Sequence, residues 1–123
     1  TLSPMHASGI GKALLAQMAA DRAARALHGA RRTRFTDKTL TDPALLAADL
    51  AKIRTRGYAI EDEEKTVGMR CVAAAIFDAN GDAVAGISVS GPTARMPEHA
   101  LTRIGDHVIK AANTVTEGIG GQT

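Results

Sequence analysis

Residues 61–64 place four acidic side chains in a row, and Cys71, the one cysteine of the chain, follows seven residues after Glu64. Such a run fits a solvated turn, a metal site or one wall of a pocket. Calcium is disfavoured because the alternating oxygen ligands and the glycine of an EF-hand loop are missing. Zinc is disfavoured because Cys71 has no CxxC partner. The sequence therefore predicts no metal site and no cofactor, and leaves the solvated turn and the pocket wall open.

Catalysis by Cys71 would require a nearby base that activates the thiol. The histidines stand in no recognisable catalytic spacing; they are His6, His28, His99 and His107. We therefore predict that the chain has no catalytic residue and is not an enzyme.

Residues 9–12, Gly-Ile-Gly-Lys, resemble the end of a phosphate-binding loop. That pattern requires glycine where His6 stands, and Ser or Thr where Ala13 stands, so nucleotide binding by this route is rejected. The backbone N–H groups near Gly9 and Ile10 would still favour a carboxylate or a phosphate, because they open a helix. The alternative is a helix start that is capped by its own Ser8.

Apolar spacing and end signals predict the elements that position these residues. The predicted helices cover residues 9–19, 20–28, 43–56 and 97–117, and the predicted strands cover 58–60, 68–77 and 83–90. Asp42 and Pro43 give the third helix a clear start, and Gly57 ends it. The side chains expected to face the core are Ile10, Leu14, Leu15 and Met18; Ala24 and Leu27; Leu45, Leu46, Leu50 and Ile53; and Leu101, Ile104, Val108, Ala112 and Val115.

Asn80-Gly81 lies between two strand-like runs and predicts an antiparallel hairpin. With these two residues as the loop, Ala79 faces Asp82, and Cys71, Ala73 and Ala75 lie opposite Ser90, Ser88 and Gly86. One face of the hairpin then holds these six small residues, and the other holds Val72, Ala74, Ile76, Ala85, Ile87 and Val89. The small face fits a hollow with polar hydroxyls, or a closely packed helix. A three-residue loop with a bulge at Gly81 would shift the pairing by one residue.

Helices around an antiparallel sheet indicate an α+β fold. Because two or three strands make a poor sheet alone, we expect further strands upstream or from a partner. Length predicts one domain over residues 1–123. The lone cysteine and the lack of a signal peptide or an apolar run of about 20 residues predict a cytoplasmic protein that does not enter a membrane.

Charge is distributed unevenly along the chain. Residues 1–60 hold ten basic and four acidic residues (+6), whereas residues 61–123 hold five basic and nine acidic ones (−4). The densest basic spot comprises Arg31, Arg32 and Arg34, without interleaved aromatic residues or a helix-turn-helix pattern. We therefore predict a solvated loop there and no DNA contact by this chain.

Four segments together resemble the effector-binding domain of IclR-type bacterial transcription regulators: MHASGIGKALLAQM, RFTDKTLTD, RGYAIEDEEKTVGMRCVAAAIFDANGD and GISVSGPTARM. The resemblance covers most of the chain in the same order and is strongest to the isocitrate lyase, or glyoxylate-shunt, regulators. It implies a GAF/profilin-like fold, a mainly antiparallel sheet flanked by helices, whose first strands lie upstream. It also implies an N-terminal winged helix-turn-helix that is absent here, DNA binding through that domain, and a homo-oligomer, either a dimer or a tetramer.

The resemblance further implies a pocket for a short carboxylate, glyoxylate- or pyruvate-like, with the effector-binding positions Gly9, Ile10, Glu61, Cys71, Ser88 and Ser90. Glu61 replaces a family aspartate, and Ile10 replaces a smaller residue, so both narrow the pocket. Pro97 replaces a Ser or Thr helix cap. A carboxylate beside an anionic ligand is unfavourable unless the repulsion between the two negative charges is relieved. Three arrangements would do so: Glu61 is protonated, or it accepts a hydrogen bond from a ligand hydroxyl, or it orients another hydrogen-bond donor. We favour the hydroxyl. The alternative to a sensing domain is an assembly module without a functional pocket.

Overall fold

The computed structural model describes residues 6–18, 22–23, 25 and 34–122. Its elements are α1 (Gly9–Gln17), α3 (Pro43–Arg56), β1 (Ala59–Asp62), β2 (Met69–Phe77), β3 (Ala83–Pro92), a 3-10 turn (Glu98–Ala100) and α4 (Leu101–Gly118). Most of the helix predicted over residues 20–28 lies outside the described residues, as do its core positions Ala24 and Leu27 and the basic residues Arg31 and Arg32.

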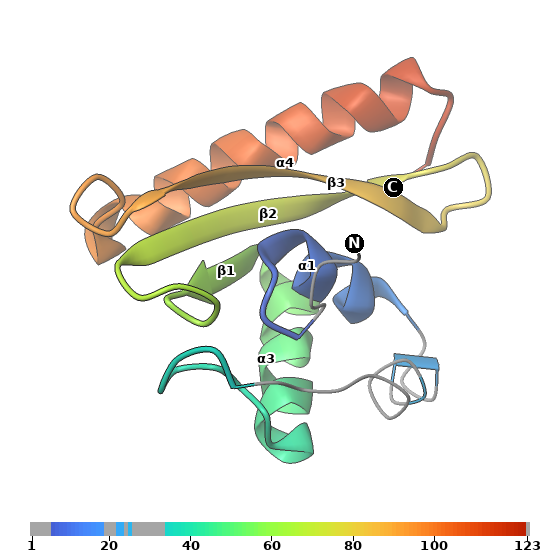
Figure 1. The fold of residues 1–123 in the computed structure, drawn as a ribbon. Helices are drawn as coiled ribbons and strands as arrows, with labels where there is room; N and C mark the ends of the chain where they lie inside the picture. The colour runs from blue at the N-terminus through green and yellow to red at the C-terminus, as the bar shows by residue number, and fades with distance from the viewer. Residues whose placement is uncertain (1–5, 19–21, 24, 26–33, 123) are drawn as a thin grey trace.

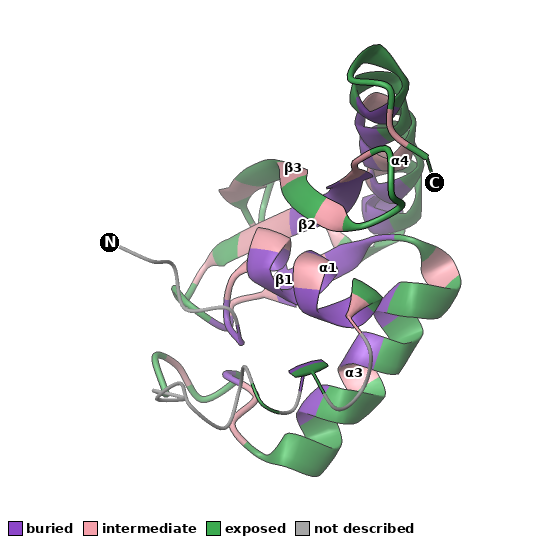
Figure 2. Ribbon diagram, turned by 90° about the vertical axis from the view of Figure 1, so that its right-hand side faces the viewer, coloured by how far each residue is buried: buried purple, intermediate pink, exposed green. Residues whose placement is uncertain are grey.

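The three strands form one antiparallel sheet in the order β1-β2-β3, which confirms the α+β class. Helix α4 covers one face of the sheet, and α1 covers the other, with α3 packed behind α1 (Figure 1). β2 is the central strand, and its residues 72–76 are buried between the two helical layers. β3 lies at the edge and is much more exposed (Figure 2).

The core beneath α4 is formed by the larger apolar side chains of the hairpin and by the stripe of the last helix. Its buried members are Tyr58, Val72, Ala74, Ile76, Met96, Leu101, Val108 and Ala112. The predicted stripe is wrong at its end, because Val115 is 38% exposed. Thr116 is buried in its place, since its Oγ1 accepts the backbone N–H of Phe77.

The core on the opposite face combines alanines with the larger side chains of Leu15, Leu50 and Ile53. Its buried members are Ala13, Leu15, Ala16, Ala23, Leu50, Ile53, Ala59 and Ala73. The predicted stripe of α3 is wrong at Leu45, which is 60% exposed, whereas Leu46 is fully buried. The ends of α3 match the prediction: the Asp42 carboxylate accepts the N–H of Ala44, and Gly57 stops the helix with φ 93°.

The β2–β3 loop contains residues 79–81, so the predicted two-residue loop is wrong. Asp78 pairs with Asp82 through a backbone hydrogen bond of 2.9 Å, and Gly81 takes φ 78°. The longer loop forms because the Asp78 carboxylate accepts the N–H groups of Asn80 and Asp82.

A β-bulge next to this loop offsets the extra loop residue and restores the predicted pairing of β2 with β3. Phe77 pairs with Ala83 and Ile76 pairs with Ala85, so Val84 is the extra residue of β3. The pairs beyond the bulge are Cys71 with Ser90, Ala73 with Ser88 and Ala75 with Gly86, which confirms the predicted register. Among the described residues, no helix is long and apolar enough to cross a bilayer.

Candidate functional site

A hollow of about 250 Å³ opens where the start of α1 meets the Cys71 end of the hairpin. Its lining residues are Ser8, Gly9, Ile10, Glu61, Lys65, Thr66, Met69, Arg70, Cys71, Ser88 and Ser90. The structure thus brings all six sequence-predicted positions to one place, although they come from four separate segments of the chain.

The start of α1 sits directly on the sheet. A Cβ at Gly9 would lie 2.6 Å from the Cys71 Sγ, and a Cβ at Gly86 would lie 2.8 Å from a methyl carbon of Ile10. With a larger residue than glycine at either position, the facing side chain or the helix would have to shift. Both interpretations of the small face therefore hold in part: the helix packs closely over Ala73 and Gly86, and the hollow remains only at the Cys71 end.

The backbone N–H groups of Gly9 and Ile10 are the first two of the helix. Ser8 caps α1, but its Oγ accepts the N–H of Gly11 at 3.2 Å rather than either of these two. Neither group has a hydrogen-bond partner among the described residues. Two donors at the positive end of a nine-residue helix thus border the hollow.

Ser88 and Ser90 line the hollow from the edge strand β3 and are both solvent-exposed. The hollow is therefore open on this side, and their hydroxyls are accessible to a ligand that enters from solvent. Cys71, between the serines and Glu61, is half-buried.

The acidic run divides into two kinds of residue. Asp62 and Glu63 point outward and form ion pairs of 2.8 Å with Arg70 and 2.7 Å with Lys38. The hydrogen bond from Lys38 lowers the pKa of Glu63. Glu61, by contrast, is only 7% exposed and lines the hollow. Glu61 thus forms part of the pocket wall, whereas the partly exposed Asp62, at the end of β1, and Glu63 pair with basic side chains.

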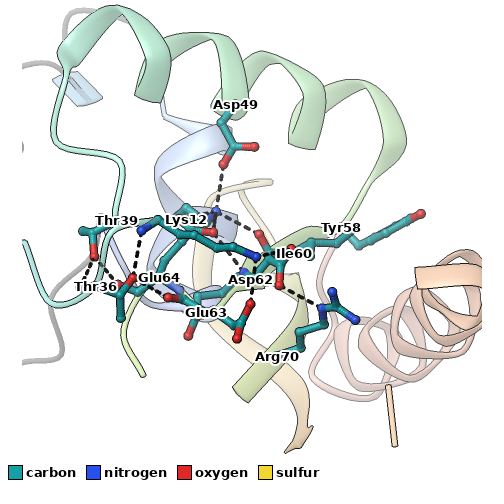
Figure 3. Close-up of polar contacts among 12 residues, drawn as sticks. Lys12, Thr36, Thr39, Asp49, Tyr58, Ile60, Asp62, Glu63, Glu64 and Arg70 are labelled. Carbon is teal, nitrogen blue, oxygen red and sulfur yellow. Dashed lines mark hydrogen bonds and ion pairs between the residues drawn. The ribbon is translucent and has the colours of Figure 1, made fainter. Parts of the chain in front are cut away.

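Glu64 is buried too, and it meets a buried cation that the sequence did not predict. Lys12 is fully buried, and its Nζ donates to Glu64 Oε2 at 2.8 Å, to Asp49 Oδ2 at 2.8 Å and to the Ile60 carbonyl at 2.8 Å (Figure 3). These contacts join α1, α3 and the β1–β2 loop. The hydroxyl of Thr39 also donates to the Glu64 carbonyl and holds the same loop.

Burial raises the pKa of both Glu61 and Glu64. For Glu64, the attraction of the Lys12 ammonium and its hydrogen bond partly offset that rise. For Glu61, the N–H groups of Glu64 and Lys65 oppose it, while the nearby Glu64 carboxylate adds to it.

Lys65 is a further lining residue that sequence reasoning missed. It directly follows the acidic run, and its ammonium has no ion pair among the described residues. Arg70 is engaged elsewhere, with Asp62 and with the Met96 carbonyl. Across the described part of the chain, no group of three or more His, Cys, Asp or Glu could hold a metal ion.

The structure is thus a layered α+β domain with a small polar hollow at a helix start, the kind of concave site in which small molecules are bound. A family model described as "Bacterial transcriptional regulator IclR C-terminal" matches residues 1–117. The chain therefore belongs to the IclR family of bacterial transcriptional regulators and corresponds to their C-terminal, effector-binding part.

Named relatives agree with this assignment. The HTH-type transcriptional regulator BhcR of Paracoccus denitrificans is 56% identical over 119 residues, which are 97% of this chain and 43% of the relative. The transcriptional repressor IclR of Escherichia coli is 47% identical over 118 residues, 96% of this chain and 43% of the relative. The chain thus spans less than half the length of these regulators. Their names describe regulators, which confirms the prediction that this chain is not an enzyme.

Solved structures give the same fold. The C-terminal domain of the E. coli transcriptional regulator KdgR superposes with a TM-score of 0.89 and 34% identity, over 96% of this chain and 72% of that one. The Thermotoga maritima IclR superposes with a TM-score of 0.89 and 33% identity, over 94% of this chain and 47% of that one.

Proposed function

We propose that this chain is the sensing part of a DNA-binding transcription regulator, and that its hollow binds a short carboxylic or 2-oxo acid, such as glyoxylate or pyruvate. One observation carries the proposal: helix-start amides, two serine hydroxyls, Cys71 and Glu61 border a single hollow. At about 250 Å³ it is smaller than the pockets of roughly 300–1,000 Å³ that hold drug-sized ligands, which suits an acid of two or three carbons.

In this proposal the ligand carboxylate accepts hydrogen bonds from the N–H groups of Gly9 and Ile10 and from the hydroxyls of Ser88 and Ser90. The arrangement is favourable because the helix start carries partial positive charge. Lys65, at the rim, adds a full positive charge that attracts anions. The other end of the ligand faces Glu61.

Membership of the IclR family supports a proposal for the parts of the regulator outside this chain. DNA binding would belong to a helix-turn-helix domain outside these 123 residues, in a cytoplasmic homo-oligomer, either a dimer or a tetramer. Strands upstream of this chain would pair with the open edge of β3 and complete the sheet. Ligand binding would favour one quaternary arrangement through a difference in affinity between two states.

Calorimetric titration with glyoxylate, pyruvate and other short acids tests the proposal. We expect saturable heat that is lost in the double variant Ser88→Ala, Ser90→Ala. Thr114→Ala is the control, because it removes a hydroxyl from the exposed side of α4, far from the hollow, and should leave binding unchanged. An oligomer that binds no acid would refute sensing and favour the assembly module.

A further inference from the structure

The buried charges beside the hollow do not balance. Two buried carboxylates, Glu61 and Glu64, and the partly exposed Asp49 lie near one buried ammonium, that of Lys12, which contacts Asp49 and Glu64. All three N–H donors of Lys12 are used, by Asp49, by Glu64 and by the Ile60 carbonyl. No donor of Lys12 remains for Glu61.

Among the residues that the structure describes, Glu61 is therefore the carboxylate of the group without a cation in contact. Its Oε2 accepts the N–H of Glu64 at 2.9 Å, so its direct neighbours are backbone amides. The Glu64 carboxylate lies near enough to disfavour its charge, and Lys12 acts on it only through space.

The other described elements around the hollow supply little positive charge to balance the Glu61 carboxylate. β3 contributes only the serine hydroxyls, and Cys71 on β2 is a thiol. The guanidinium of Arg70 is held by Asp62. Lys65 is exposed, so water and salt screen its charge.

An anion in the hollow would add a negative charge next to an already negative group. Two close carboxylates disfavour each other's charge, most strongly where one of them is buried as Glu61 is, and proton uptake by one of them relieves the repulsion. We propose that the hollow binds its acid together with a proton, and that Glu61 takes up this proton. The neutral Glu61 carboxyl then donates its O–H to the 2-oxo oxygen at the end of the ligand that faces it, whereas an ionised Glu61 would repel the bound acid. This inference rests on the proposed function, because it requires that an organic acid enters the hollow.

The geometry singles out Glu61 from its neighbours. The Lys12 ammonium, 2.8 Å from Glu64, favours the ionised form of that carboxylate, and Asp49 contacts the same ammonium and is partly open to water. Burial already raises the pKa of Glu61 in the free protein, which is the direction that favours proton uptake. A ligand hydroxyl, the route favoured from the sequence, is then not required.

Calorimetry in pairs of buffers with different ionisation enthalpies counts the protons exchanged on binding. The probe is pyruvate, and the pH is kept above the pKa of Glu61 in the free protein. The wild type should then take up about one proton for each pyruvate bound. Its Kd for pyruvate should therefore rise about tenfold per pH unit. Glu61→Gln should bind pyruvate with no proton uptake and with an affinity that does not depend on pH. Glu63→Gln is the matched control: it lies in the same acidic run but pairs with Lys38 outside the hollow, and should behave as the wild type.

The two proposals fail in different ways. Pyruvate binding by the wild type without proton uptake and with constant Kd between pH 6 and 8 would overturn the proton-coupled mode and leave the sensing function intact. Loss of pyruvate binding in Glu61→Gln would also overturn it, because an ionised acceptor would then be essential. A wild type that binds none of the short acids would overturn both.

Discussion

The contact between Gly9 and Cys71 allows a sharp test of how α1 sits on the sheet. A methyl group at Gly9 would lie 2.6 Å from the Cys71 Sγ, well inside van der Waals contact, and 3.4 Å from the Ala73 Cβ. Overpacking of this kind costs about 1–3 kcal/mol. Alanine has a higher helix propensity than glycine, which returns up to about 1 kcal/mol. The net expectation for Gly9→Ala is a loss of about 1–2 kcal/mol in the free energy of unfolding.

The variant Cys71→Ala removes the sulfur atom that the new methyl would strike. In this background the closest remaining neighbours of a Cβ at residue 9 are carbons at 3.4 Å, an ordinary contact. Gly9→Ala should therefore become neutral or slightly stabilising, which gives a coupling energy of about 1–3 kcal/mol between the two sites.

Urea unfolding of the four proteins in the cycle measures this coupling. Gly118→Ala in α4 is the control for helix propensity, because a Cβ there would meet no atom within 4 Å. Effects of Gly9→Ala and Cys71→Ala that add to within about 0.5 kcal/mol would refute the close seating of α1 on Cys71.

Three further substitutions test other parts of the structure. Lys12→Met leaves the buried Glu64 without its cation and should cost about 3–5 kcal/mol in urea unfolding; a surface-like loss below about 1 kcal/mol would contradict the burial. Gly105→Ala would place a Cβ 2.6 Å from the Tyr58 ring and should cost about 1–3 kcal/mol; an unchanged Tm would contradict this packing of α4. The third substitution, Glu61→Gln, concerns pH. The pKa of Glu61 is raised above 4.5 in the folded protein, so the folded state binds the Glu61 proton more tightly than the unfolded state does. The contribution of Glu61 to the free energy of unfolding therefore falls as pH rises from about 4.5 through the folded pKa. Glu61→Gln should therefore gain in Tm relative to the wild type between pH 4.5 and 7, and a constant difference would contradict the raised pKa.

Local signals predicted the elements and the faces of the hairpin well. Alternation along β2 and β3 assigned Cys71, Ser88 and Ser90 to one face, and the structure has them there. The register was correct even though the predicted loop was one residue too short, because the Val84 bulge compensates for the longer loop. Bulges depend on twist and on contacts at the sheet edge, which a loop motif does not report.

The buried Lys12 could not be predicted from its neighbours in sequence. Its partners Asp49 and Glu64 lie 37 and 52 residues away, and only the tertiary fold brings them together. A lysine in an apolar helix normally indicates a solvated side, so pattern reasoning assigns it to the surface. The same network explains why Glu64 is buried while Asp62 and Glu63 are partly exposed, which composition alone left open.

The central claim is that an organic acid binds at the start of α1. A two-dimensional ¹⁵N–¹H NMR titration with pyruvate or glyoxylate observes the relevant groups directly, because each backbone amide gives its own signal. We predict that the signals of Gly9 and Ile10 shift saturably, together with those of Cys71, Ser88 and Ser90. Saturable shifts confined to other parts of the chain, or no shift with either acid, would contradict the claim.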